Sequence, residues 1–488
     1  MFYRFLRKES YELMNRFTTY IKENLFSILL LSGSLIFYIF FAFYDGAVIC
    51  VDSPTYISMS FAREPFYPLL LAFFRLFNPD SYLLYVVILQ SILMAVSGWI
   101  LADYLRKKLY IHKLYSIVLY LLPIATSLLC RFAAQRASMY TNSIMTEGIC
   151  TSLYLLFIYC ILKYLWDDSK THITAAWIIS FLMISSRKQM LMVLPILFLA
   201  IVYTNFNHKK FWRGVMIATV SCLMIFPAFK LFDCTYNYFV RGVFQGHSSS
   251  NRFVTTMVFY NADRSDAEYI EDENAKQLFL NIYDVCDESG YLGSHAGEGW
   301  FHEVNHFGDH YDHIQIDTMW PMILQHARNT INTEYQNSGL TEEELLTLYD
   351  VETDRLNSIM ISSILPHQLP ELAKSLINNF LSGLVITVAQ LKQILVPYTV
   401  VIFLLYFALT GKLAWYWYKN KNVHSDNVEL SSKNVVFATI TLLGIFFNVL
   451  LVSAVIFCQT RYTIYNMPLF YMAGAVLLYQ NVMLSLKK

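Results

Sequence analysis

NVVFATITLLGIFFNVLLVSAVIF, residues 434–457, is the stretch that decides the fold class of this chain. Its 24 residues contain no charged side chain, and about 20 apolar residues are enough to cross a bilayer as one helix. Segments of the same character recur along the chain. We therefore predict an all-α polytopic membrane protein, a bundle of about ten transmembrane helices over residues 24–43, 81–101, 114–130, 145–165, 172–186, 189–206, 214–232, 393–416, 434–457 and 463–483.

The composition of the whole chain agrees with this fold class. Only 15% of the 488 residues are charged and 56% are hydrophobic, whereas soluble domains are roughly 25% charged. Lys plus Arg and Asp plus Glu both number 36, so the net charge is zero. These values exclude a disordered chain, a basic nucleic-acid-binding protein and an ordinary soluble enzyme. The eight Cys residues lack the paired spacing of a disulfide framework or a zinc finger.

The distribution of Lys and Arg predicts the orientation in the membrane. With the N-terminus in the cytoplasm, 19 Lys and Arg residues fall on the cytoplasmic side and seven in the short outer loops. Cytoplasmic loops of membrane proteins carry such an excess of positive charge. We therefore expect a multi-pass protein of the cell membrane with both termini in the cytoplasm, which requires an even number of spans.

This topology leaves one long segment on the outer side of the membrane. Residues 233–372 hold 23 acidic and six basic residues, a net charge of −17. A segment of this size is expected to be a domain rather than a loop. The predicted organisation is an N-terminal transmembrane module over residues 1–232, whose outer loops carry the candidate site, an acidic extracytoplasmic domain over 233–372 and a C-terminal transmembrane module over 373–488.

The outer domain is predicted to be mostly helical. Its patterns indicate helices over 264–286 and 341–363, the second preceded by a capping box of Thr341 and Glu344. A third, amphipathic helix is predicted over 369–391 and would run directly into the eighth span.

Charged and aromatic residues gather in the predicted outer loops. Loop one reads CVDSPTYISMSFAREPFYPLLLAFFRLF over 50–77, and loop two reads RFAAQRASMYTNSIMTEG over 131–148. Charge close to the membrane core is expensive and is therefore a sign of function. The candidate site residues are Asp52, Tyr56, Arg63, Tyr67, Glu147, Arg187, Arg461 and Tyr462.

These residue types suit group transfer from a lipid-phosphate donor. A carboxylate such as Asp52 can take a proton from an acceptor hydroxyl. Arg63, Arg187 and Arg461 come from different loops and could neutralise a departing phosphate, which a guanidinium binds through its forked geometry. Two other interpretations stay open: the arginines could contact lipid headgroups, and Glu147 could be a charge favoured by a helix N-terminus.

The order of several motifs resembles the GT-C glycosyltransferases. Loop one contains D-S-x-x-Y followed by R-x-P-x-Y-P-L-L-L, which is similar to the first loop of bacterial members. MTEG resembles the acid-containing second loop of that family, and SSRKQMLMVLPILFLA resembles its span in which Arg precedes an apolar run. ILPHQLPELAKSLINNFLSGL is similar to the segment that leads from the outer domain back to the membrane.

The resemblance implies an activity and roles for individual residues. It implies a GT-C-like bundle and inverting transfer of a sugar from a polyprenyl-phosphate donor to a glycan, lipid or protein acceptor on the outer face. Asp52 matches the catalytic base of the family, and Glu147 the second acid. Tyr56, Tyr67 and Tyr462 are expected to contact substrate, and Arg63, Arg187 and Arg461 the donor phosphate. Protein O-mannosyltransferases have two adjacent acids in loop one, whereas Ser53 follows Asp52 here, so neither the sugar nor the acceptor is predicted.

A histidine-rich segment supplies the competing pattern. HAGEGWFHEVNHFGDHYDH, residues 295–313, contains HEVNH, and on a helix His302 and His306 could bind zinc beside Glu303. In so His-rich a segment the chance expectation of one such match is on the order of 0.1, and Gly299 and Gly308 predict at most a short helix. A zinc protease, a non-proteolytic divalent metal site and a solvated or substrate-contacting segment are the three interpretations.

A flippase for lipid-linked saccharides is a further alternative, although the predicted spans are almost free of charge away from their ends.

Overall fold

The computed structural model describes residues 24–133, 138–247, 250–336, 339–389, 391–423 and 425–486. These residues are almost entirely helical, and the only β pairing among them is a single bridge between Val48 and Ser143. The fold is therefore all-α, as the apolar segments predict.

Within this described part, nine helices are long and apolar enough to cross a membrane. The first, Asn24–Tyr44, carries no label in the figures. The others are α4 (Tyr82–Lys108), α5 (Lys113–Ala133), α6 (Thr146–Asp167), η2 continued by α8 (Lys188–Met192 and Val193–Asn207), α9 (Phe211–Arg241), α16 (Leu395–Asn420), α17 (Asp426–Ser453) and α19 (Met467–Leu486).

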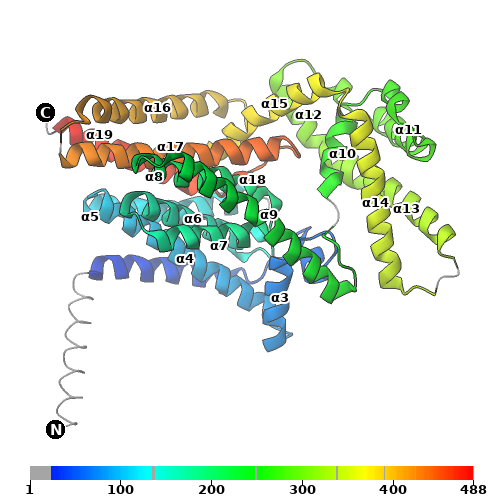
Figure 1. Cartoon of the computed structure of the whole chain (residues 1–488), viewed down its shortest axis with the longest axis horizontal. Coiled ribbons are helices and arrows are strands. Elements are labelled where there is room, and N and C mark those ends of the chain that lie inside the picture. The colour runs from blue at the N-terminus through cyan, green and yellow to red at the C-terminus, as the bar shows by residue number, and fades with distance from the viewer. Residues whose placement is uncertain are drawn as a thin grey trace, which may run out of the picture.

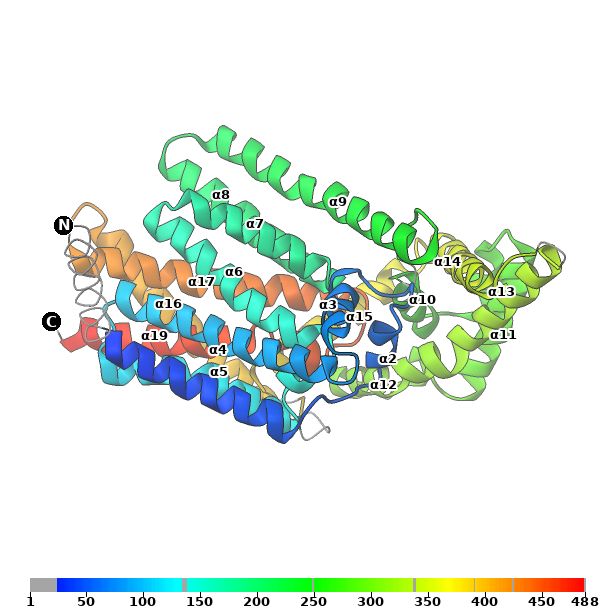
Figure 2. The same ribbon diagram turned by 90° about the horizontal axis from the view of Figure 1, so that it is seen from below.

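The fifth predicted span is a shorter apolar helix, α7 (Lys170–Ile184). Its 15 residues give a length of roughly 22 Å, less than the core of a bilayer. Figure 2 nevertheless shows α7 lying along the bundle beside α6 and α8. The helix that starts at Asn24 begins at the end of the bundle where α19 finishes (Figure 2). The first and last described helices of the bundle therefore have their outer termini at the same end.

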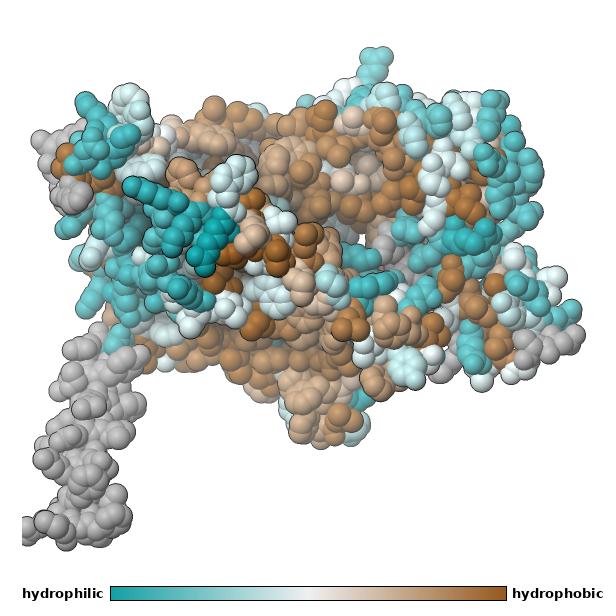
Figure 3. All heavy atoms as spheres, in the orientation of Figure 1, coloured by the Kyte–Doolittle hydropathy of each residue, from teal (hydrophilic) through white to brown (hydrophobic). Residues whose placement is uncertain are grey.

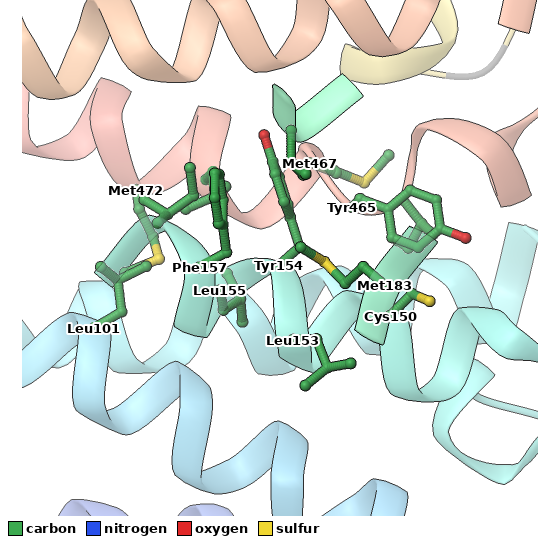
Figure 4. Close-up of a cluster of buried hydrophobic side chains, with 14 of the residues drawn as sticks. Leu101, Cys150, Leu153, Tyr154, Leu155, Phe157, Met183, Tyr465, Met467 and Met472 are labelled. Atoms are coloured by element: carbon green, nitrogen blue, oxygen red, sulfur yellow. The ribbon is translucent and has the colours of Figure 1, made fainter. Parts of the chain in front are cut away.

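The surface and the interior of the bundle fit a membrane protein. A hydrophobic band covers its middle, with hydrophilic residues at both ends (Figure 3). Inside, helices far apart in sequence pack through large side chains: Tyr154 and Phe157 of α6 lie close to Met183 of α7 and Met467 of α19 (Figure 4). The protein is an all-α polytopic membrane protein.

Short helices lie in the segments that join the spans at one end of the bundle. They are α2 (Ser53–Ile57) and α3 (Phe66–Phe77) in loop one, η1 (Tyr140–Asn142) before α6 and α18 (Thr460–Thr463) before α19. In Figure 1, α3 lies across the direction of the spans. The Val48–Ser143 bridge joins the segments before α2 and α6, and thereby holds loops one and two together.

The segment between α9 and α16 forms a helical domain beyond this end of the bundle (Figure 1). It has its own core around Phe259, Phe279 and Tyr311. Its elements are α10 (Ser250–Tyr260), η3 (Arg264–Tyr269), α11 (Glu273–Glu288), η4 (Gly293–His295), α12 (Trp300–Asp312), η5 (His313–Met319), α13 (Trp320–Glu334) and α14 (Glu342–Ile364). The next helix, α15 (Leu369–Val388), leads back to the bundle and packs against α17.

Several local predictions for this segment need correction. The predicted helix 264–286 is divided into η3 and α11, because Asp263 and Asp272 each cap a separate start. α15 ends at Val388 and α16 starts only at Leu395, so no continuous helix enters the eighth span. HEVNH lies in a regular helix, α12, because Gly299 caps its start and Gly308 is accommodated inside it. The capping box of Thr341 and Glu344 is confirmed.

Candidate functional site

Five of the predicted charged residues form one connected network where the loops meet the outer domain. Arg63 Nη2 donates to Asp52 Oδ1 at 2.8 Å, and Arg461 Nη2 donates to Asp52 Oδ2 at 2.6 Å. Arg461 Nε donates to Glu147 Oε1 at 2.9 Å, and Arg187 Nη1 reaches the same oxygen at 2.7 Å. Residues more than 400 positions apart in the sequence therefore share one set of ion pairs.

Asp52 is positioned by the start of α2. It occupies the N-cap of this helix, and the next residue, Ser53, is fully buried. The Ser53 hydroxyl donates to the carbonyl of Ile144 at 2.9 Å and accepts the Cys50 amide at 2.7 Å. Ser53 therefore fastens loop one to loop two, a role that a second carboxylate could not fill because a carboxylate cannot donate.

Glu147 is held at the first turn of α6 and is fully buried. A buried carboxylate is costly unless it is paired, and here two guanidiniums pair with it. Behind it, Gly148 leaves room for the carboxamide of Gln90, which a Cβ at this position would approach to 2.7 Å. Gln90 also accepts from the Tyr67 hydroxyl at 3.0 Å. Tyr67 therefore supports the site from behind rather than facing the ion pairs.

One tyrosine ring lies under two of the arginines. The Arg187 and Arg461 guanidiniums lie 5.0 Å and 5.2 Å from the centre of the Tyr462 ring. The backbone carbonyl of Tyr462 accepts from Gln189 at 2.6 Å and from Asn448 at 2.8 Å. These bonds fix α18, which carries Arg461, against α17 and against η2, which directly follows Arg187. The backbones that carry the two guanidiniums are therefore fixed relative to each other.

Arg63 is held within loop one itself. Its guanidinium lies 4.5 Å from the centre of the Tyr56 ring, and its Nε donates to the Thr55 hydroxyl at 2.7 Å. Tyr56 is buried, which raises the pKa of its hydroxyl to about 12 although the charge of Arg63 opposes the shift. Tyr56 in turn packs edge-on against Tyr67, with ring centres 5.3 Å apart.

The network fixes the charge state of Asp52. Burial alone would raise the pKa of the Asp52 carboxyl, but the charges of Arg461 and Arg63 outweigh it and hold the pKa well below its ordinary range. The charge of Glu147, and to a smaller extent that of Asp52, raises the pKa of the Arg461 guanidinium against the effect of burial. Asp52 is therefore an ionised carboxylate whose basicity is suppressed while both arginines are bound to it.

A small cavity adjoins Glu147 on the bundle side. Its volume is about 20 Å³, enough for about one water molecule. Thr126, Ser127, Thr141 and Thr151 are among the residues that line it. The cavity therefore offers no room for a molecule much larger than water.

The HEVNH segment does not have the geometry of a zinc site. His302 is exposed, and the two ring nitrogens of His306 lie 3.2 Å from the Tyr260 hydroxyl and 3.2 Å from the Gly290 carbonyl. Glu303 pairs with Lys374 at 3.0 Å and Asn378 at 2.7 Å. Among the described residues no group of three or more His, Cys, Asp or Glu side chains could hold a metal ion. His302 and His306 thus lie in the outer domain and are not joined to the ion-pair network.

The predicted site residues Asp52, Glu147, Arg63, Arg187, Arg461, Tyr56 and Tyr462 come from separate loops and form one set of contacts in the structure. Ser53 and Thr55, which were not predicted as site residues, lie beside Asp52 in the D-S-P-T-Y motif and hold loop one in shape. Arg252 of the outer domain was not predicted either, because nothing in the local sequence gives a signal for it.

Comparison of the chain with known proteins found no similar protein. No protein-family model matches this chain, and no match was found among curated proteins or solved structures. The site is therefore interpreted from its own geometry.

Proposed function

We propose that the protein is a membrane glycosyltransferase of the GT-C type, which moves a sugar from a polyprenyl-phosphate donor to an acceptor hydroxyl on the outer face of the membrane. The observation that carries the proposal is the network itself: Arg63, Arg187 and Arg461 share two carboxylates, Asp52 and Glu147. Three cations and two anions leave one positive charge, which complements the single negative charge of a phosphodiester.

In the proposed reaction Asp52 is the general base. It takes the proton of the acceptor hydroxyl as the hydroxyl oxygen attacks the anomeric carbon. The bond from this carbon to the phosphate oxygen breaks, and the polyprenyl phosphate leaves with the electron pair. Arginines stabilise the developing charge on the leaving phosphate, as preorganised cations do in phosphoryl and glycosyl transfer.

The ion pairs around Asp52 require one further step. A carboxylate bound by both Arg63 and Arg461 is a weak base, because its negative charge is already stabilised. We propose that the donor phosphate draws one or both guanidiniums away from Asp52. The loss of these partners would raise the pKa of the Asp52 carboxyl, so that the base becomes active only when the donor is bound.

The surroundings agree with a lipid-linked donor. α3, the second helix of loop one, carries the exposed apolar residues Phe73, Leu76 and Phe77 and lies across the direction of the spans (Figure 1). Such a helix suits the membrane surface. The proposed orientation places this end of the bundle and residues 233–372 outside the cytoplasm, so the outer domain would cover the site and select the acceptor.

The test is turnover of purified protein in lipid nanodiscs with a panel of radiolabelled polyprenyl-phosphate hexoses and cell-envelope extract as acceptor. We expect the wild type to release polyprenyl phosphate with at least one donor. The Arg187→Gln variant should release far less, and Arg264→Gln should match the wild type because Arg264 is an exposed arginine paired with Asp284. Absence of turnover and of donor binding across the panel would contradict the proposal.

A further inference from the structure

A fourth arginine, Arg252 of α10, reaches the site from the outer domain. Its guanidinium lies 5.1 Å from the centre of the Phe253 ring and 5.1 Å from the centre of the Trp320 ring. Its Nε is buried without a hydrogen-bond acceptor. Among the described residues no carboxylate lies within ion-pair distance of this guanidinium, whereas Arg63, Arg187 and Arg461 each have one.

The charge of Arg252 acts on the network from nearby. Burial lowers the pKa of the Arg252 guanidinium, the positive charge of Arg63 lowers it further, and the negative charge of Asp52 opposes the shift. A buried N–H without an acceptor and a like charge nearby are both unfavourable in the empty site. The two aromatic rings offset only part of this cost.

The backbone next to Arg252 is anchored to the transmembrane bundle through Tyr311. The Tyr311 hydroxyl is within hydrogen-bond distance of the carbonyls of Phe253, at 3.2 Å, and Val455, at 3.1 Å. The Tyr311 ring packs against Phe457, with centres 5.3 Å apart. The start of α10, which carries Arg252, is thereby tied to the segment that leads into α18.

We infer that Arg252 and Arg63 form a phosphate subsite, in which the outer domain and loop one bind the phosphate of the lipid-linked substrate from two sides. The inference rests on the proposed function. A bound phosphate would explain both features of Arg252. Its oxygen would accept the hydrogen bond of the Arg252 Nε, and its negative charge would offset the repulsion between Arg252 and Arg63. A guanidinium can offer two parallel N–H groups to such oxygens, which a lysine cannot do.

The test is titration of the full-length protein, in nanodiscs of phosphatidylcholine, with a polyprenyl phosphate. We expect Arg252→Gln to bind it roughly ten- to a hundred-fold more weakly than the wild type, the range given by loss of one charge-assisted hydrogen bond. Arg252→Lys should recover only part of the loss. Arg264→Gln is the matched control, because it removes an equal charge from the exposed surface of the same domain.

Thermal stability separates ligand binding from a structural role. Because Arg252 is an unpaired cation, Arg252→Gln should leave the melting temperature of the empty protein unchanged or higher, while the rise on adding polyprenyl phosphate becomes smaller. A lower melting temperature with an unchanged ligand-induced rise would overturn the inference. The inference would also be overturned if phosphatidylglycerol raised the melting temperature as much as polyprenyl phosphate does and this rise depended on Arg252, since the subsite would then bind bulk lipid headgroups. If the wild type binds no polyprenyl phosphate, the proposed function itself fails; if Arg252→Gln binds as tightly as the wild type, only the subsite fails.

Discussion

Glu147→Gln is the substitution that tests the ion-pair network most sharply. Glutamine keeps the shape of the side chain and removes its charge. Glu147 is fully buried and accepts from Arg187 at 2.7 Å and Arg461 at 2.9 Å. In the variant Arg461 keeps the carboxylate of Asp52. Arg187 loses the carboxylate it pairs with and keeps only neutral partners: the carboxamide oxygen, the Thr146 hydroxyl at 3.3 Å and the Tyr462 ring.

The expected loss of stability follows from that unpaired cation. Removal of one partner from a buried ion pair costs about 3–5 kcal/mol, because the remaining charge is left desolvated. We therefore expect the free energy of unfolding of Glu147→Gln to fall by about 3 kcal/mol or more. The double variant Glu147→Gln with Arg187→Met should lose less than the single one, since an apolar side chain of similar size needs no partner.

The assay is reversible denaturation of the purified protein in mixed micelles, followed by circular dichroism. Glu429→Gln is the control, because Glu429 is two-thirds exposed, pairs with Lys433 within one helix, and should contribute less than about 0.5 kcal/mol. A loss below about 1 kcal/mol for Glu147→Gln, or a double variant less stable than the single one, would refute the network.

Three further predictions concern the chemistry. Asp52→Asn should bind polyprenyl phosphate more tightly than the wild type in a nanodisc titration, because Arg63 and Arg461 no longer share their charge with a carboxylate; weaker binding would contradict the exchange of partners. The pH profile of kcat/KM reports the free protein. As the pH is lowered through the range in which carboxyls ordinarily titrate, kcat/KM should not fall, because the pKa of Asp52 in the free protein lies below that range. As the pH is lowered, kcat should begin to fall at a higher pH than kcat/KM, because the bound phosphate removes the arginines from Asp52 and so raises the pKa of its carboxyl. Acid limbs at the same pH in the two profiles would refute this step. His302→Ala and His306→Ala should leave transfer unchanged, since neither residue contacts the network, and loss of activity together with loss of bound zinc on elemental analysis would restore the metal hypothesis.

Much of the fold could be predicted because the membrane imposes a simple rule on sequence. A stretch such as 434–457 must be a helix long enough to satisfy its backbone within lipid, and α17 (Asp426–Ser453) is that helix, displaced toward the N-terminus. Where water replaces lipid the rule no longer applies. α15 ends at Val388, where Ala389 is extended, and hydropathy gave no sign of that end.

Site residues could be predicted from the sequence where their charge is unusual for its surroundings. Asp52, Glu147 and Arg461 stood out because charges beside apolar spans are rare and costly. The pairing among them could not be derived, because it depends on how α6, α18 and loop one pack in three dimensions. Arg252 lies in a polar domain where an arginine is ordinary, so only its burial without a partner distinguishes it.

The most direct test of the account is the rate of sugar transfer in a single turnover, with a polyprenyl-phosphate hexose already bound, for the wild type and for Asp52→Asn. Loss of a general base lowers such a rate roughly 10²- to 10⁴-fold. We predict a loss in this range with donor binding retained or strengthened. An Asp52→Asn protein that binds the donor and transfers the sugar at close to the wild-type rate would contradict the central claim.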